Sequence, residues 1–141
     1  MAGKAYDVIV IGAGPGGYVA AIRAAQLGLK AIVVEREHMG GICLNWGCIP
    51  TKAMLRSSEV YHLMHRAKEF GLSVENIDYD LDAVVDRSRG IAKQLNSGVT
   101  HLLKKNKVAT LMGDATITGP NKVVVKTAKG GEPLTAKHII I

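Results

Sequence analysis

The pattern of apolar and polar positions near the start of the chain predicts a strand, a helix and a second strand. Residues 6–11 form an apolar run of the kind that makes a buried β-strand. An alanine-rich stretch over residues 18–27 has helical spacing, with Pro15 near its first turn and Gly28 placed to end it. Residues 31–34 form a second apolar strand that ends at Glu35. This order is typical of a parallel α/β sheet.

The middle of the chain predicts two helices joined by an irregular connection. The first helix runs from residue 52 to about residue 69, and Gly71 is placed to stop it. Residues 72–79 have the composition of a connection, and Asp80 can cap the helix that follows. This second helix is long and carries one apolar stripe, for which we expect ordinary packing. The stripe consists of Leu81, Val84, Val85, Ser88, Ile91, Leu95, Val99, Leu102 and Leu103.

From residue 108 the pattern changes to short β runs. Turns rich in glycine separate four runs, over residues 108–112, 115–118, 122–127 and 133–137. This spacing predicts a small antiparallel meander. Residues 138–141 are an apolar run typical of a parallel strand covered on both faces. Because no turn or capping residue follows this run, we expect the chain to be the N-terminal piece of a longer protein.

Composition limits the class of protein. A chain of 141 residues with 48% hydrophobic residues can bury the core of one domain. We find neither a signal-peptide pattern nor an apolar run long enough to span a bilayer, so we expect a cytoplasmic protein without membrane contact. The net charge of +6 comes from scattered Lys and Arg residues, and few aromatic residues accompany them, which disfavours a nucleic-acid-binding protein. The histidines are expected at the surface. His62 and His65 lie three residues apart, but a metal site would need a third ligand near them, and none is evident in the sequence.

A glycine motif follows the first predicted strand directly. Residues 12–17 read G-A-G-P-G-G, which fits the pattern G-x-G-x-x-G. In such a motif Gly12 makes the tight turn, Gly14 lets the backbone approach a pyrophosphate, and Gly17 lets the helix pack closely on the strand. The start of the helix then faces the anion. Glu35 is placed to accept hydrogen bonds from an adenosine ribose, so the pattern predicts a site for FAD or NAD rather than NADP.

The only two cysteines, Cys43 and Cys48, follow this unit. On a regular α-helix, residues with this spacing have Cα atoms roughly 8.6 Å apart, which exceeds the limit of roughly 7 Å for a disulfide. A bridge would therefore require a distorted turn, and Gly47 is where a non-helical backbone costs least. A bridge that closes so short a loop would stabilise by only about 2 kcal/mol and would be easily reduced. Two buried free thiols are the alternative, but the neighbouring dinucleotide motif favours a redox pair that works with a flavin.

These motifs resemble those of the class I pyridine nucleotide-disulfide oxidoreductases. The resemblance rests on the glycine motif, on Glu35 and on residues 41–52, which read G-I-C-L-N-W-G-C-I-P-T-K. It implies an α/β fold, a Rossmann-like FAD-binding domain with a parallel sheet, helices and a small antiparallel meander, incomplete at its C-terminal end. Residues 1–141 would be the N-terminal part of that domain. The NAD-binding and dimer-interface domains of the parent protein would be absent from this chain.

The resemblance also implies roles for individual residues. Cys43 would be the interchange thiol that reacts with substrate, and Cys48 the thiol that lies against the flavin. Lys52 would lie near the reactive edge of the flavin, although its spacing fits a solvent-exposed lysine equally well. The turn at residues 113–115 would help to cover the adenine end. The cofactor-binding residues implied are Gly12, Gly14, Pro15, Gly16, Gly17, Glu35, Gly41, Cys43, Gly47, Cys48, Lys52, Gly113 and Ala115.

Within the family, the cysteine segment is most similar to the members that oxidise dihydrolipoamide for the 2-oxoacid dehydrogenase complexes. In such members electrons pass from dihydrolipoamide to the disulfide, then to FAD and then to NAD⁺. The implied partners are lipoyl domains and, in the parent protein, a second copy of the chain. A glutathione or mercuric reductase is an alternative within the family. A binding module that holds a dinucleotide without turnover is an alternative from another class.

The sequence departs from the family pattern in three respects. Ile42 stands where most members have threonine, so backbone amides or water would have to replace a hydroxyl contact to the cofactor phosphates. Trp46 stands where relatives have a smaller aliphatic residue, and the sequence gives no functional reason for it. The histidine and glutamate that act as the acid-base pair in the family belong to the absent C-terminal part. We therefore expect this chain to be inactive alone.

Overall fold

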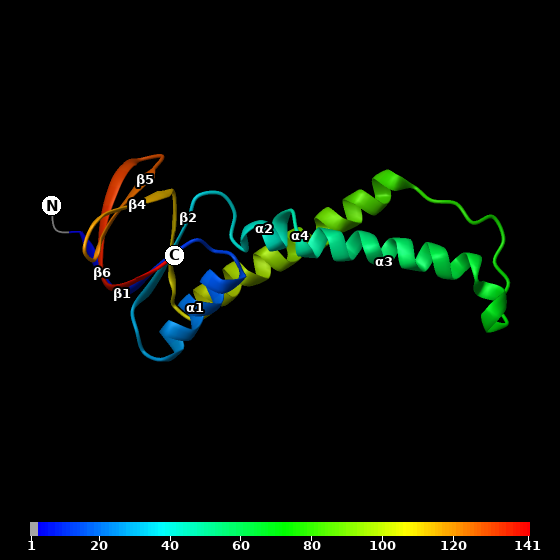
Figure 1. Ribbon diagram of the computed structural model, residues 1–141, viewed down its shortest axis with the longest axis horizontal. Coiled ribbons are helices and arrows are strands. Elements are labelled where there is room, and N and C mark those ends of the chain that lie inside the picture. The colour runs from blue at the N-terminus through cyan, green and yellow to red at the C-terminus, as the bar shows by residue number, and fades with distance from the viewer. Residues whose placement is uncertain (1–2) are drawn as a thin grey trace.

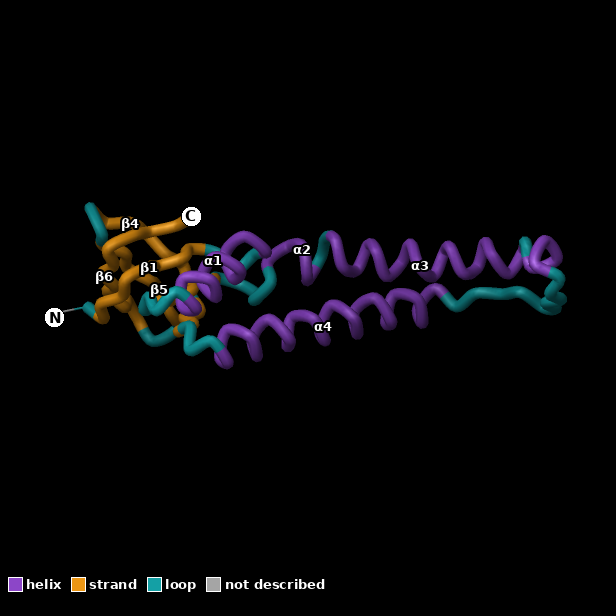
Figure 2. Tube along the Cα trace, turned by 90° about the horizontal axis from the view of Figure 1, so that it is seen from below, coloured by secondary structure: helices purple, strands orange, loops and turns teal. Residues whose placement is uncertain are grey.

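The structure is a computed structural model that describes residues 3–141. It consists of a mixed sheet, one helix that packs on it, and a helical hairpin that extends away from it, with a short helix at the base of the hairpin (Figures 1 and 2). The elements are β1 (Lys4–Ile11), α1 (Pro15–Gln26), β2 (Ala31–Glu35), α2 (Gly41–Asn45), α3 (Cys48–His65), the 3-10 helix η1 (Ala67–Phe70), α4 (Leu81–Lys105), β3 (Ala109–Met112), β4 (Asp114–Gly119), β5 (Lys122–Thr127) and β6 (Gly130–Ile140).

The six strands lie in the order β3-β2-β1-β6-β5-β4. Strand β1 is parallel to both β2 and β6, and β2 is parallel to β3. Strands β4, β5 and β6 are antiparallel and form the predicted meander. The prediction that residues 108–112 belong to the meander is wrong, because β3 pairs with β2. The reason is the crossover through α4, which returns the chain to the same edge of the sheet in the parallel direction.

Strand β6 is continuous where the sequence predicts two strands. Its first part pairs antiparallel with β5, and its second part pairs parallel with β1, from the register Lys4 with Leu134 to Val10 with Ile140. The prediction of a parallel strand after residue 137 is therefore confirmed. The prediction that this strand is covered on both faces is wrong for the described chain, since His138 and Ile140 are exposed. Helix α1 packs mainly on β1 and β2, so it leaves this end of β6 uncovered.

The core lies on both faces of β1 and β2. On one face Val8, Val10 and Val33 pack with residues of α1 and with Val99 and Leu103 of α4. On the other face Ile9, Ile32 and Val34 pack with apolar residues of β5 and β6. This division follows the alternation of side chains along a strand. The centre of the sheet is therefore the most completely buried part of the molecule.

The helices of the hairpin begin and end close to the predicted residues. Helix α3 begins at Cys48 rather than at residue 52, and the helical region ends at Gly71, as predicted, with φ +73°. The Asp80 side chain accepts a hydrogen bond from the Ala83 N–H at 3.0 Å, which confirms the predicted cap.

Packing does not account for the whole apolar stripe of α4. Among its members, Ser88, Val99 and Leu103 are buried, whereas Leu81, Leu95 and Leu102 are exposed. Leu81 lies at the start of α4, where the helix extends beyond the sheet and runs along α3 (Figure 2). Within residues 3–141, the helices lack the combination of length and apolar content needed to cross a membrane.

Candidate functional site

The glycine turn joins β1 to α1 in a shape that only small residues allow. Gly12 has φ +101°, and its N–H donates to the Val34 carbonyl oxygen at 2.8 Å. A Cβ atom added at Gly17 would collide with the carbonyl oxygen of Gly12. This contact accounts for glycine at position 17, because any side chain would push α1 away from the end of β1.

The space above this turn fits a dinucleotide pyrophosphate. Cβ atoms added at Gly12, Gly14 and Gly16 would meet nothing within 4 Å, so these glycines face open space. Helix α1 starts with Pro15, and its first intrahelical hydrogen bond is from the Tyr18 N–H to the Gly14 carbonyl at 3.0 Å. Within residues 3–141, no side chain caps this helix start. Its first amides can therefore donate to an anion.

Glu35 lies at the end of β2 and is fixed against the glycine turn. One carboxylate oxygen accepts a hydrogen bond from the Ala13 N–H at 2.8 Å, and the other accepts from the Glu37 N–H at 2.9 Å. A carboxylate can accept about four hydrogen bonds, so acceptor capacity remains for a ribose hydroxyl. The Glu35 backbone carbonyl also accepts from the Gly113 N–H at 2.8 Å. The predicted ribose acceptor therefore lies beside Gly113. The predicted turn at residues 113–115 is shorter than expected, because β4 begins at Asp114.

A cavity of about 390 Å³ lies at the carboxyl ends of β1 and β2. This is the edge of a parallel sheet at which ligands bind in open α/β folds. The cavity brings together five of the predicted residues, Gly12, Glu35, Gly41, Gly113 and Ala115. It is also lined by residues that the sequence did not assign to a site, notably Arg36, Glu37, His38 and Trp46.

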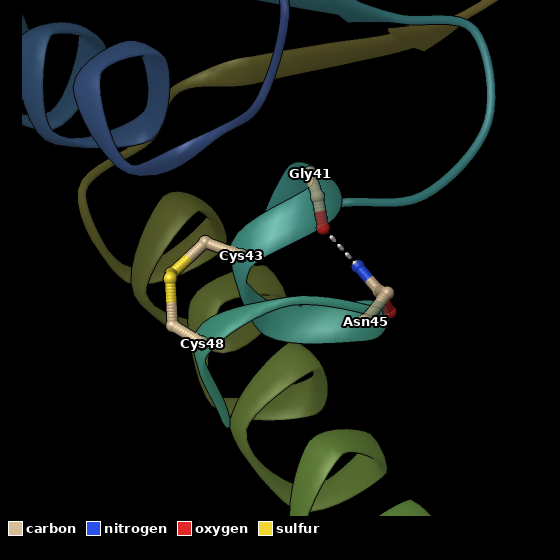
Figure 3. Close-up of a disulfide and its surroundings, with 4 residues drawn as sticks. All are labelled: Gly41, Cys43, Asn45 and Cys48. Carbon is tan, nitrogen blue, oxygen red and sulfur yellow. Dashed lines mark hydrogen bonds between the residues drawn. A yellow bond between two sulfur atoms is a disulfide. The ribbon is translucent and has the colours of Figure 1, made fainter. Parts of the chain in front are cut away.

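The two cysteines form a disulfide at a break between α2 and α3 (Figure 3). Their Cα atoms are 4.7 Å apart, well below the separation on a regular helix. The Ile42 carbonyl accepts from both the Trp46 N–H at 2.9 Å and the Gly47 N–H at 2.7 Å, which widens the turn. Gly47 has φ −111° and ψ −109°, and a Cβ atom there would lie 3.1 Å from the Ile42 carbonyl oxygen. The predicted distortion at Gly47 is confirmed.

The start of α2 packs directly on the glycine turn. The Gly40 N–H donates to the Ala13 carbonyl at 2.8 Å. Gly41 has φ +60°, and a Cβ atom there would lie 2.8 Å from the Gly14 Cα atom. Glycine at position 41 thus allows the cysteine-bearing helix to approach the dinucleotide motif.

The exposure of the two cysteines does not identify which one reacts with substrate. Cys43 is half-buried and packs against the core, whereas Cys48 is exposed. In this chain Cys48 is thus the more exposed of the two residues, so the assignment of Cys43 as the interchange thiol rests on the family resemblance. Lys52 lies on α3 one turn after Cys48 and is exposed. Within residues 3–141 it has no ion pair with a carboxylate.

Trp46 and His38 form an aromatic wall of the cavity. Their ring centroids are 5.2 Å apart, and the rings are tilted by 56°. The same two residues also line a second hollow, together with Arg89, Lys93 and Asn96 of α4. One sequence signal could have indicated Trp46: it is the only tryptophan in the chain and stands inside the cysteine segment. Ile42, which also lines the cavity, is 74% exposed.

Comparison with known proteins agrees with this geometry. Residues 6–141 match the family described as pyridine nucleotide-disulphide oxidoreductase. The chain belongs to this family. The pyridine nucleotide-disulphide oxidoreductase match covers the glycine turn, Glu35, both cysteines and all six strands except the first residues of β1. It confirms the predicted α/β fold class with a parallel core and an antiparallel meander.

Similar relatives within the family carry the name dihydrolipoyl dehydrogenase. A protein from Rhizobium etli is 54% identical over 98% of this chain and 32% of its own length. One from Zymomonas mobilis is 58% identical over 96% of this chain and 29% of its own length. One from Acholeplasma laidlawii is 48% identical over 98% of this chain and 40% of its own length. The chain therefore spans about a third of the length of these relatives.

Proposed function

We propose that residues 1–141 are the N-terminal part of the FAD-binding domain of a dihydrolipoyl dehydrogenase, and that Cys43 and Cys48 are its redox centre. One observation carries this proposal. The disulfide lies at the break between α2 and α3, and the start of α2 packs on the glycine turn beside the cavity. The parent protein would use FAD and NAD⁺, form a homodimer and serve the lipoyl domains of a 2-oxoacid dehydrogenase complex. The similarity to relatives named dihydrolipoyl dehydrogenase supports this choice over a glutathione or mercuric reductase.

The residues of this chain would hold FAD along the cavity. The amides at the start of α1 would bind the pyrophosphate above the three glycines that face open space. Glu35 would accept hydrogen bonds from the adenosine ribose. Gly113 and Ala115, on the opposite side of Glu35 from the glycine turn, would cover the adenine end. Ile42 offers no hydroxyl, so backbone amides or water would complete the phosphate contacts.

The cysteine pair would oxidise dihydrolipoamide by thiol-disulfide exchange. A substrate thiolate attacks the Cys43 sulfur, the Cys43–Cys48 bond breaks, and Cys48 leaves as a thiolate. The second substrate thiol, as its thiolate, then attacks the substrate sulfur of the mixed disulfide, which closes the ring of lipoamide and releases Cys43 as a thiolate. The substrate loses two electrons, which the cysteine pair keeps as two thiolates, and two protons, which pass to water. Bound FAD would supply a two-electron acceptor for this dithiol, with NAD⁺ as the final acceptor.

Substitution of either cysteine in the full-length protein tests this function. We expect Cys43→Ser and Cys48→Ser each to abolish turnover of dihydrolipoamide while the circular dichroism spectrum stays that of the wild type. Ser58→Ala, at an exposed position on α3, is the control and should retain turnover. Wild-type turnover by either serine variant would overturn the dithiol mechanism. If the wild-type protein instead turns over glutathione disulfide or Hg(II), and the serine variants lose that activity, the protein belongs to another branch of the family.

The 141-residue chain alone should bind FAD weakly. The cavity is open to solvent and Cys48 is exposed, so this chain alone surrounds the cofactor incompletely. We expect the purified chain to be nearly colourless and to gain little bound flavin in equilibrium dialysis against FAD. Tightly bound FAD at one equivalent per chain would show that these residues suffice.

A further inference from the structure

A hydrogen-bonded network links the redox loop, which we define as residues 41–48, to the middle of α4. The Asn45 side-chain amide donates to the Met39 carbonyl at 3.0 Å and to the Gly41 carbonyl at 2.8 Å. The second of these bonds spans α2, as Figure 3 shows, on the side of the loop away from the disulfide. The Asn96 side-chain amide donates to the same Met39 carbonyl and, at 3.0 Å, to the Asn45 side-chain oxygen. Asn96 therefore contacts one residue before Cys43 in the chain, Met39, and one after it, Asn45.

A second residue of α4 contacts the same asparagine from another direction. The Arg89 guanidinium donates to the Asn45 backbone carbonyl at 3.2 Å. This carbonyl lies in the last turn of α2, where backbone acceptors lack partners within the helix. Arg89 and Asn96 thus hold the side chain and the backbone of Asn45 at once.

Helix α4 is well anchored where it makes these contacts. Asn96 lies one turn before Val99, which is buried in the core with Leu103. The position of Asn96 is thus set by packing against the sheet and α1, and none of its hydrogen bonds involves a sulfur atom. The network can therefore persist when the disulfide opens.

We propose that Asn96 is a positioning residue that holds the redox loop through Asn45 and thereby shifts the equilibrium of Cys43 and Cys48 toward the disulfide. The proposal rests on the proposed redox function of the pair. With the network intact, the reduced thiols stay close to each other, and closure of the disulfide is an intramolecular step at high effective concentration. Without it, the loop samples conformations in which the thiols lie apart, and the disulfide is less favoured.

The test is the thiol-disulfide equilibrium of the purified chain in glutathione buffers, read as the mass shift of alkylated thiols. We expect Asn96→Leu to lower the equilibrium constant for disulfide formation about tenfold, which corresponds to about 30 mV. Arg89→Met should shift it in the same direction by about threefold, because one hydrogen bond to a single carbonyl is lost. Gln94→Leu makes the same change of polar to apolar side chain at an exposed position of α4 and should match the wild type.

A purely structural role for Asn96 gives a different result. In that case Asn96→Leu would lower the urea midpoint equally for the oxidised and reduced chains and leave the equilibrium constant unchanged, which overturns the proposal. If Asn96→Leu fails to fold by circular dichroism, Arg89→Met decides: an unchanged equilibrium constant overturns the proposal and a shift supports it. If the wild-type pair forms no disulfide in any buffer, the proposed redox function fails and the positioning role fails with it. If the wild-type pair forms the disulfide and a folded Asn96→Leu variant has the same equilibrium constant, only the positioning role is overturned.

Discussion

The two sides of the cavity are built in different ways. The glycine side consists of β1, α1 and β2, which are consecutive in the chain and enclose fully buried residues such as Ile9 and Val33. The redox side consists of the short helix α2, which is held by hydrogen bonds from α4 and by a disulfide. Apolar packing therefore fixes the side that would hold the cofactor, whereas the redox side combines the packing of one buried residue of α2, Leu44, with polar contacts and the disulfide. This difference predicts that stability depends mainly on the first side and thiol chemistry mainly on the second.

The same substitution on the two sides should give the largest contrast. Ile9 is 0% exposed and packs between β2 and the meander, so Ile9→Ala should lower the free energy of unfolding by about 4 kcal/mol. Ile42, in the redox loop, is 74% exposed, so Ile42→Ala should change it by less than about 0.5 kcal/mol. Urea unfolding followed by circular dichroism measures both. Equal losses for the two variants would contradict the division between the sides.

Two neighbouring glycines on the glycine side differ in their surroundings: Gly17 is closely packed, and Gly16 faces open space. An alanine at position 17 would meet the Gly12 carbonyl, so Gly17→Ala should cost about 3 kcal/mol. Gly16 faces open space, so Gly16→Ala should leave the free energy of unfolding within about 1 kcal/mol of the wild type. In the full-length protein, Gly16→Ala should still weaken FAD binding, because its methyl group occupies the space above the turn. A folded Gly17→Ala variant as stable as Gly16→Ala would rule out the close contact of α1 with β1.

Reduction of the disulfide should have a smaller effect on stability. The loop between Cys43 and Cys48 is short, with a sequence separation of 5, so its closure contributes only about 2 kcal/mol. Urea midpoints with and without a phosphine reductant measure this difference. The double variant Cys43→Ser with Cys48→Ser is the control and should not respond to the reductant. Unfolding of the wild-type chain on reduction would show that the bridge is a structural staple rather than an exchangeable bond.

The smallest expected effect concerns the loss of folding stability at acidic pH. A hydrogen bond from Lys137, at 2.8 Å, and a second from the Lys30 N–H lower the pKa of the Asp7 carboxyl below its usual value. A lowered pKa in the folded state means that Asp7 contributes stability above its usual pKa, and that this contribution disappears as the pH falls through the lowered value. Asp7→Asn should therefore flatten the loss of stability in acid slightly. Urea midpoints between pH 6 and pH 3 should show this difference. The same loss of stability in acid for the variant and the wild type would show that this ion pair contributes nothing.

The sequence predicted the glycine side better than the redox side for a physical reason. The strand, turn, helix and acid that form the first side are neighbours in the chain, and their periodicity and glycine spacing reflect contacts within residues 4–35. The distortion at Gly47 was also predictable, because the spacing of the cysteines excludes a regular helix. The contacts of Asn96 and Arg89 with Asn45 could not be predicted, since they depend on how α4 packs across the sheet. The parallel pairing of β3 depends on the same crossover and was missed for the same reason.

The most direct test of the account is the visible absorbance spectrum of the full-length protein during anaerobic titration with a dithiol. If Cys43 and Cys48 form a redox pair beside a flavin, reduction should produce a long-wavelength band from the Cys48 thiolate against the flavin. The band should be absent in Cys48→Ser. A flavin that is bleached in one step in the wild type, or a protein that carries no flavin at all, would contradict the central claim that this disulfide and FAD act together.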